Sequence, residues 1–535
     1  MFPHLYRRSS MKVSRRMRRQ SLLAGLLVVA ISLSGTACAT NQGADTARDN
    51  KTVLTVGVTS APVSLNPVKA DWDGGTQVMG FLTNESLLTL NSDGTVGPGL
   101  ATSFRYTGDG SRTLELVLRH DARFSDGAMV TAQAVKTWLE YFSKTPGPHQ
   151  TNIALQSVDA VDQWTVRINL ASPNPLVPLM LAGGYLWGSV SSPGSVENPQ
   201  TLERTTAGAG QYMLDVAGTV AGDHYTLVPN NFYYDKSRVH FSKIIVKVIT
   251  NASSMLQAMQ AGQVDVAQGD SSTAESASRA GLTITHAPAV FNAMFFLDHS
   301  GTISKPLADS RVRQALNYAV DRTSVTAAST GGLGGTPTSA WEPLDLRGLD
   351  PTYKNYYPYD PEKAKSLLAE AGYPGGFQFS VLCNGASMNY VAKMCQAVAE
   401  DYRRIGVNLQ IANPATSAEA QQEFSSGKFA ALISPWSITP TWVDTSTFLE
   451  PNGALNQHGW KDPIIDQIWQ SSTSEPVEQQ ASSWKSIVER TITEAYLVPL
   501  LQSNLYYYAS KSIGGVAVTT AADLFRPIAT DWFAK

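Results

Sequence analysis

Two kinds of apolar periodicity interleave along this chain. Over 114–118 every second residue is apolar, which predicts a strand with one buried face and one solvated face. Over 134–142, after Thr131, apolar residues recur at intervals of three and four, which predicts an amphipathic helix that begins at a capping residue. Because the two patterns alternate along most of the chain, we expect an α/β (α+β) fold in which helices cover sheets.

Further elements follow from the same signals. A helix is expected over 361–371, because Asp360 suits the cap, Pro361 suits the first position and Gly372 ends it. Other helices are expected over 312–320, after a cap at Asp309, and over 389–405, and strands over 52–58, 164–170, 244–249 and 407–411. Two stretches rich in Gly, Pro and Ser, 191–199 and 329–339, are expected to be surface loops.

The N-terminus has the pattern of an export signal. Residues 1–37 carry seven Lys or Arg and no acidic residue, and they include an apolar run over 22–33, which is shorter than the roughly 20 residues that span a bilayer. Cys38 follows the small residues at the end of this segment and resembles the acylated cysteine of a lipoprotein signal. We expect a signal peptide over 1–37, lipidation of Cys38 and a linker over 38–51; ordinary secretion with Cys38 incidental is the alternative.

The rest of the chain is expected to be an acidic body outside the cytoplasm. Without the seven N-terminal cations, 34 basic residues oppose 44 acidic ones, so nucleic acid is not an expected partner, because its binding is carried largely by Lys and Arg. The two remaining cysteines, Cys383 and Cys395, are expected to form a disulfide in an oxidising compartment. Two buried thiols are the alternative.

The sequence lacks the common motifs of enzymes and metal sites. None of its eight His pairs as in H-E-x-x-H, and there is no G-x-S-x-G elbow, no phosphate loop and no G-x-G-x-x-G after a strand. We therefore expect no catalysis, no cofactor and no metal. Asp and Glu are plentiful, so a secreted hydrolase with a carboxylate pair is kept as the least favoured hypothesis.

Several segments resemble signatures of one protein family and occur in the family's order. Residues 118–127 read LRHDARFSDG and 312–322 read VRQALNYAVDR; the second resembles the most recognisable helix of that family. Residues 87–104, 262–266 and 359–373 are similar to further stretches. Over about 52–535 the chain resembles the family 5 extracellular solute-binding proteins, which include the peptide-, nickel- and oligosaccharide-binding components of ABC importers.

The resemblance implies a two-lobe, periplasmic-binding-protein-like fold with two crossover segments and an extra subdomain in lobe one. The crossings are expected near Val290–Asp298 and Val498–Ala509. The implied parts are lobe one at 52–292 with the subdomain at about 80–200, lobe two at 293–504, and a C-terminal return to lobe one at 505–535. A ligand bound between the lobes would bias a hinge closure, and the closed monomer would dock on ABC permease and ATPase subunits.

The expected ligand site departs from the family pattern. In peptide binders of the family, an Asp three residues after a Trp pairs with the ammonium of the peptide, and a Phe follows further on. Counting forward from Trp436 places Thr439 at that position, and counting back from Phe448 places Thr441 there. Since a hydroxyl cannot supply the ion pair that a buried ammonium needs, recognition of a free N-terminus is less secure here.

The candidate ligand-binding residues are those implied by the same resemblance. They are Trp436, Thr439, Thr441, Trp442, Asp444, Asn292, Trp72 and Trp341. Core packing is the alternative for the tryptophans, and a hydrogen bond within the hinge is the alternative for Asn292. The leading functional hypothesis is a lipid-anchored solute-binding protein for peptides or another polar oligomer; a non-transport envelope lipoprotein built on the same scaffold is the alternative.

Overall fold

The computed structural model describes most of the chain after residue 51. The described residues are 52–535 apart from 71–73, 109, 149, 151–152, 332–333, 346–348, 386–387, 389, 452, 473–474, 476 and 520–527. The predicted signal peptide, Cys38, the linker and Trp72 lie outside the described residues.

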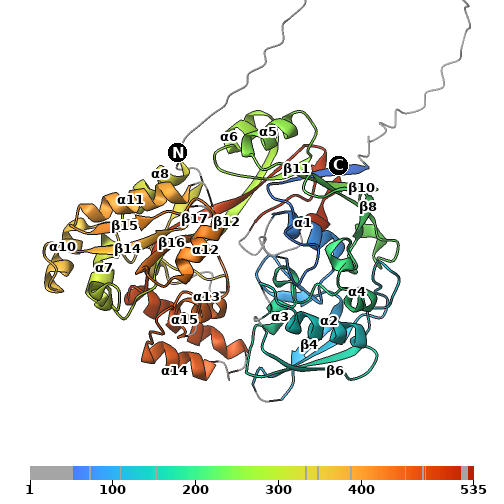
Figure 1. Ribbon diagram of the computed structural model, residues 1–535, viewed down its shortest axis with the longest axis horizontal. Helices are drawn as coiled ribbons and strands as arrows, with labels where there is room; N and C mark the ends of the chain where they lie inside the picture. The colour runs from blue at the N-terminus through green and yellow to red at the C-terminus, as the bar shows by residue number, and fades with distance from the viewer. Residues whose placement is uncertain are drawn as a thin grey trace, which may run out of the picture. The chain divides into compact units, whose positions relative to one another are not determined.

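A mixed sheet of 11 strands organises the described part of the chain. Its order is β15-β14-β16-β12-β17-β11-β1-β10-β9-β8, with β13 paired to β17. The strands are β1 Val53–Val58, β8 Tyr212–Val220, β9 His224–Pro229, β10 Lys243–Val248, β11 Val266–Gly269, β12 Thr283–Phe296, β14 Gln378–Cys383, β15 Asn408–Ala412, β16 Ala431–Ser437 and β17 Leu497–Ala509. Strands β12 and β17 lie in the middle of this order and connect its two halves (Figure 1).

The β14–β15–β16 half of the sheet is covered by four helices, α7 Ser310–Tyr318, α8 Arg322–Thr330, α10 Pro361–Glu370 and α11 Val391–Arg403. The sequence predicts all of these except α8. The caps act as expected: the Asp309 carboxylate accepts from Arg311 N at 2.9 Å and Asp360 from Lys363 N at 2.9 Å. Gly372 has a φ of 91°, a left-handed conformation that ends a helix at little cost only for glycine.

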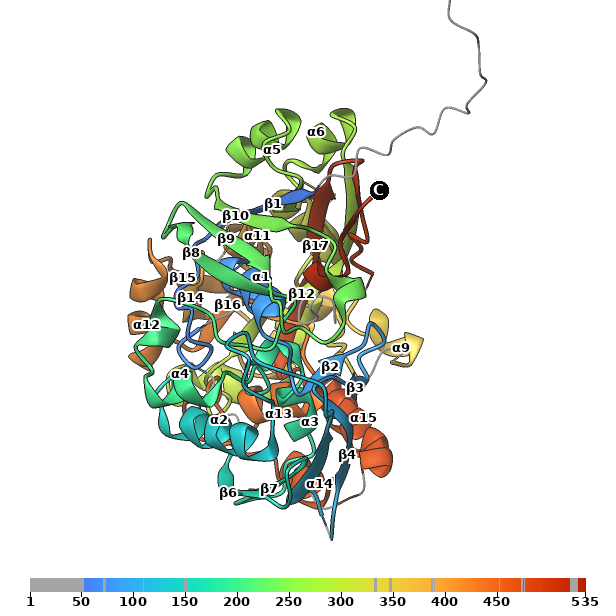
Figure 2. The same ribbon diagram turned by 90° about the vertical axis from the view of Figure 1, so that its right-hand side faces the viewer.

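A second, four-stranded sheet forms a separate layer, in the order β4-β5-β7-β6. Its strands are β4 Ala101–Tyr106, β5 Thr113–Leu118, β6 Leu155–Ala160 and β7 Thr165–Leu170, and helix α2, Ala132–Lys144, packs along it (Figure 2). Leu114, Leu116 and Leu118 are fully buried, and so is Trp138 of α2. The alternating and helical patterns of the sequence thus meet face to face in one core.

Further elements complete the described fold. The helices are α1 Gly74–Thr83, α3 Val177–Met180, α4 Pro193–Glu197, α5 Ala252–Gln260, α6 Ala274–Arg279, α9 Pro351–Lys354, α12 Ser417–Ser425, α13 Thr441–Phe448, α14 Pro463–Ser472 and α15 Val477–Thr493. The strands are β2 Leu88–Leu90, β3 Val96–Pro98, β13 Gly335–Pro337, β18 Ile513–Gly514 and β19 Phe533–Ala534.

The two expected surface loops are wrong in part. Residues 191–199 contain helix α4, and Ser191 is buried; Pro193 stands at the start of this helix, where proline is tolerated because its missing N–H has no partner to lose. Residues 329–339 contain β13, which pairs with β17. Gly and Pro therefore marked the ends of elements in both stretches rather than the absence of elements.

The 312–322 signature anchors the start of β17. The Asn317 side chain donates to Leu497 O at 3.1 Å, and buried Arg322 donates from Nε to Pro499 O at 2.8 Å. The other nitrogens of Arg322 donate to Asn317 O at 3.1 Å, Asn317 Oδ1 at 3.0 Å and Tyr357 O at 3.0 Å. A single guanidinium thus satisfies acceptors from three segments that would otherwise be buried without donors.

Replacing Arg322 by Met is expected to destabilise the protein by about 3 kcal/mol or more, because it leaves several buried carbonyls without donors. Arg403→Met is the matched control, since Arg403 is exposed and, among the described residues, forms an ion pair with Glu400 of its own helix alone; it should change stability by less than about 1 kcal/mol. Urea unfolding measures both. Equal small losses would show that Arg322 does not anchor β17.

Candidate functional site

Helix α13 carries two of the predicted site residues, Thr441 and Asp444, on its buried face. Thr441, Asp444, Thr445 and Phe448 are all buried, at the three- and four-residue spacing of one helix face. The helix begins after Pro440, whose ψ of 151° is extended. This face of α13 therefore points at the residues that precede it on β16 and at the 340–345 segment.

The Asp444 carboxylate joins three segments. Its Oδ2 accepts from Trp341 Nε1 at 2.9 Å, and its Oδ1 accepts from Trp436 Nε1 at 3.1 Å and from the Thr439 hydroxyl. Within the described ranges no Lys or Arg forms an ion pair with Asp444. Burial raises the pKa of Asp444 to about 8, although the three donors favour the ionised form.

Aromatic rings enclose this carboxylate on one side. Phe448 lies with its ring centroid 5.2 Å from that of Trp436, 6.1 Å from Trp341 and 4.9 Å from Phe295 of β12. Trp341 is fully buried and Trp436 is partly buried. Four predicted residues, Trp341, Trp436, Thr439 and Asp444, are thus brought together in one hydrogen-bonded cluster.

A second carboxylate, which sequence reasoning missed, lies against the start of α13. Asp345 Oδ1 accepts from both the backbone N–H and the hydroxyl of Thr441, each at 2.8 Å. Its other oxygen accepts no hydrogen bond from another described residue. The Asp345 side chain is exposed, yet the surrounding protein raises its pKa above the ordinary value by desolvation. It is therefore a carboxylate that a ligand can reach but that water hydrates poorly.

Tyr185 approaches the same place from a distant part of the chain. It follows α3 and is buried, and this burial raises the pKa of its phenol; the nearby charges of Asp444 and Asp345 raise it further. The next residue, Leu186, has a φ of 65°, a strained conformation for a branched side chain. The Gly183-Gly184 pair before Tyr185 was the only signal in the sequence, and Asp345 had none.

The other two described predicted residues lie apart from the cluster. The indole N–H of Trp442 is buried and has no hydrogen-bond partner among the described residues, and its ring lies 5.2 Å from that of Trp469 on α14. Asn292 is buried in β12, where its amide donates to Ser503 Oγ at 3.1 Å and to Leu501 O at 3.4 Å, both on β17. Trp442 therefore packs against Trp469 of α14, which in turn packs against Trp484 of α15. Asn292 lies between strands β12 and β17.

Comparison with known proteins places the chain in a family. Residues 95–458 match the model described as bacterial extracellular solute-binding proteins, family 5 Middle. This chain belongs to family 5 of the bacterial extracellular solute-binding proteins. It is 24% identical to the oligopeptide-binding protein OppA of Bacillus subtilis over 95% of this chain and 98% of that protein. It is also 29% identical to heme-binding protein A of Haemophilus influenzae, over 56% of this chain and only 54% of that protein.

Solved structures show the same fold. The murein tripeptide-binding protein MppA in an unliganded open form matches with a TM-score of 0.72 and 22% identity, over 90% of this chain and 97% of that one. The two-lobe α/β fold expected of a family 5 protein is thus confirmed. Among the described residues no three His, Cys, Asp or Glu gather as a metal site, and none of the described helices has the length and apolarity needed to cross a membrane.

Asp444→Asn is expected to gain stability relative to the unchanged protein as pH rises. Because the folded-state pKa of Asp444 is raised above the unfolded value of about 3.9, its contribution is fully present below pH 4 and is lost as pH rises toward about 8. Between pH 5 and 8 the difference in unfolding free energy should move by more than about 1 kcal/mol in favour of the variant. Urea unfolding at both pH values measures it; a pH-independent difference would contradict the raised pKa.

Proposed function

We propose that this family 5 protein is the extracytoplasmic solute-binding lipoprotein of an ABC importer and captures peptides or related polar oligomers by hinge closure. Family membership supports solute binding, and the similarity to an oligopeptide-binding protein and a murein tripeptide-binding protein supports peptides as ligands. The observation that carries the proposal is the accessible Asp345 carboxylate held against Thr441. No covalent chemistry is required of the site.

The position of Asp345 compensates for the missing carboxylate of the sequence. Counting back from Phe448, Thr441 occupies the place at which peptide binders of the family carry the acidic partner of the ammonium. Here Thr441 uses both its N–H and its hydroxyl to hold Asp345, which comes from a segment about 96 residues earlier. We propose that Asp345 pairs with the ammonium of the ligand and that Thr441 fixes its orientation, since a poorly hydrated carboxylate gains most from a cationic partner.

The proposed movement uses β12 and β17 as the two crossings. In this proposal lobe one comprises 52–292 with its inserted subdomain and the return segment 505–535, and lobe two comprises 293–504. Buried residues of one apolar cluster come from both parts: Tyr185 and Trp187 on one side, Trp341 and Phe448 on the other. A ligand that contacts both sides would stabilise this arrangement over an open one.

Anchoring at the membrane is proposed from the N-terminal sequence. Cys38 follows a basic and apolar leader, and an acylated cysteine would hold the protein at the outer face of the cytoplasmic membrane beside its permease. The absence of an ammonium partner in the local sequence favours the alternative, a non-transport envelope lipoprotein. With Asp345 as the proposed partner, this argument for the alternative no longer applies. Unchanged peptide uptake after deletion of the gene would favour the alternative.

Asp345→Asn is expected to abolish the preference for a free N-terminus. In isothermal titration calorimetry, the unchanged protein should bind tri-alanine more tightly than N-acetyl-tri-alanine, because only the first carries the ammonium. The variant should lose about tenfold or more in affinity for tri-alanine and little for the acetylated peptide. As pH falls, protonation of Asp345 should remove this preference. Because the pKa of Asp345 is raised, the loss should begin at a higher pH than for an ordinary Asp.

Asp350→Asn serves as the control, because Asp350 is a nearby exposed carboxylate that caps α9. It should leave both affinities unchanged. A preference that survives in Asp345→Asn would reject Asp345 as the ammonium partner. Flat thermal-shift curves for the unchanged protein across peptides, sugars and metal chelates would reject the ligand class as a whole.

A further inference from the structure

The two central strands are irregular where they pass from one half of the sheet to the other. The antiparallel register of β12 and β17 shifts between Pro288 and Val290 and again between Asn292 and Ala293. At the second shift the partners change from Leu501 to Pro499, and proline has no N–H to offer the ladder. Because a bulge bends a strand and increases its local twist, this stretch is where the crossings can flex.

Three side chains meet at this irregular stretch. Asn292 of β12 donates from Nδ2 to Ser503 Oγ of β17 at 3.1 Å. The hydroxyl of Tyr390 lies 3.0 Å from Asn292 Oδ1, to which it donates, and 2.9 Å from Ser503 Oγ. Asn292 and Ser503 are buried. Tyr390, from a third segment, thus bridges Asn292 of β12 and Ser503 of β17. This contact lies where the register of the two strands shifts.

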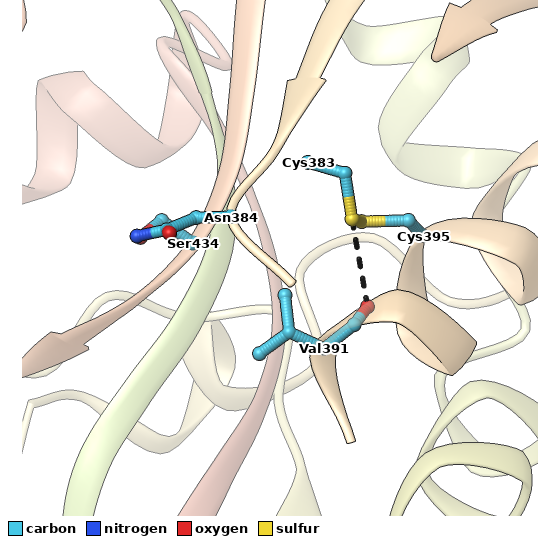
Figure 3. The surroundings of a disulfide bond; sticks show 5 residues. All are labelled: Cys383, Asn384, Val391, Cys395 and Ser434. Atoms are coloured by element: carbon cyan, nitrogen blue, oxygen red, sulfur yellow. Dashed lines mark hydrogen bonds between the residues drawn. A yellow bond between two sulfur atoms is a disulfide. The ribbon is translucent and has the colours of Figure 1, made fainter. Parts of the chain in front are cut away.

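Covalent and polar ties hold the segment that carries Tyr390. Tyr390 directly precedes α11, and a disulfide joins Cys383 at the end of β14 to Cys395 within α11 (Figure 3). Next to Cys383, the Asn384 side chain donates to Ser434 Oγ on β16 at 3.1 Å. Cys383 Sγ also lies 3.8 Å from Val391 O; this is a van der Waals contact, because a disulfide sulfur carries no hydrogen to donate. Tyr390 is therefore supported from both sides by β14, β16 and α11.

We propose that Tyr390 is a hinge latch whose hydroxyl stabilises the arrangement in which the two lobes touch. The inference rests on the hinge closure of the proposed function. Bending at Asn292 would move the crossings relative to Tyr390, because the disulfide and β16 tie the tyrosine to lobe two. The contact then separates, so without the hydroxyl the equilibrium constant for closure falls by the equivalent of one buried hydrogen bond, about fivefold. Tyr390 is a positioning residue that sets ligand affinity through this population.

Hydrogen exchange of the ligand-free protein tests the latch. Tyr390→Phe removes only the bridging hydroxyl. The segments 183–190 and 436–449, which contribute buried residues to the same cluster from opposite sides, should both exchange up to about fivefold faster in the variant. The β4-β5-β7-β6 sheet should exchange as before. A merely local role of Tyr390 would not alter these two distant segments together.

Tyr402→Phe is the matched control. Tyr402 lies on α11, the helix that Tyr390 directly precedes; it is fully buried, and its hydroxyl has no hydrogen-bond partner within the described residues. This variant should leave exchange in 183–190 and 436–449 unchanged. Unchanged exchange in Tyr390→Phe, an effect confined to residues around 390, or an equal effect of Tyr402→Phe would each overturn the latch.

Titration with tri-alanine separates the latch from the proposed ligand. Tyr390→Phe should weaken tri-alanine binding by at most about fivefold, because only the fraction of closed protein changes, and it should keep the preference over N-acetyl-tri-alanine that Asp345→Asn abolishes. Loss of that preference, or a larger loss of affinity, would overturn the latch. If no peptide binds the unchanged protein while the exchange effect is present, the latch stands and the proposed ligand class falls.

Discussion

The antiparallel pairing of β12 with β17 is the constraint on which the rest of the structure depends. These two strands, Thr283–Phe296 and Leu497–Ala509, are neighbours over most of their length although about 200 residues separate them in the chain. Strand β11 pairs with the end of β17, and β16 pairs with the second half of β12. Both halves of the main sheet are thus built on one strand pair, and a bend in this pair is the simplest motion that moves the halves as units.

The polar side chains near this strand pair differ in what they contact. Arg322 and Asn317 satisfy carbonyls at the start of β17 and so fix where the second crossing begins. Asp444 accepts hydrogen bonds from two indoles and a hydroxyl. Asp345 alone keeps an oxygen free of other described residues while remaining exposed. These two carboxylates near one tyrosine therefore differ: three side-chain donors hold Asp444, whereas one oxygen of Asp345 accepts from no other described residue, and this is the oxygen that the proposed function assigns to a ligand cation.

Local sequence patterns predicted many of the helices and strands but did not reveal several residues of the candidate site. The alternation at 114–118, the caps Asp309 and Asp360 and the breaker Gly372 each predicted an element that the structure contains, because period and capping act over a few residues. Asp345, Tyr185 and Tyr390 carry no such local signal. Each acquires its place through interactions with residues 96 or more positions away, which only the folded topology brings together.

The apparent loss of the ammonium partner also shows that a local sequence pattern cannot reveal a residue contributed by a distant segment. A count along the sequence finds Thr439 or Thr441 where a carboxylate is expected, and the count is right about the residue. In the proposed function the carboxylate is Asp345, which comes from another segment and is held by Thr441. Substitutions at one position of a binding site can therefore be compensated in space without any trace in the local sequence.

Small-angle X-ray scattering of the mature protein, with and without saturating tri-alanine, tests the central claim that the two halves close on a ligand. The account predicts that the radius of gyration falls on binding and that a peptide bound under the same conditions is recovered unaltered by mass spectrometry. A radius of gyration that stays the same while calorimetry shows the peptide bound would contradict closure about β12 and β17.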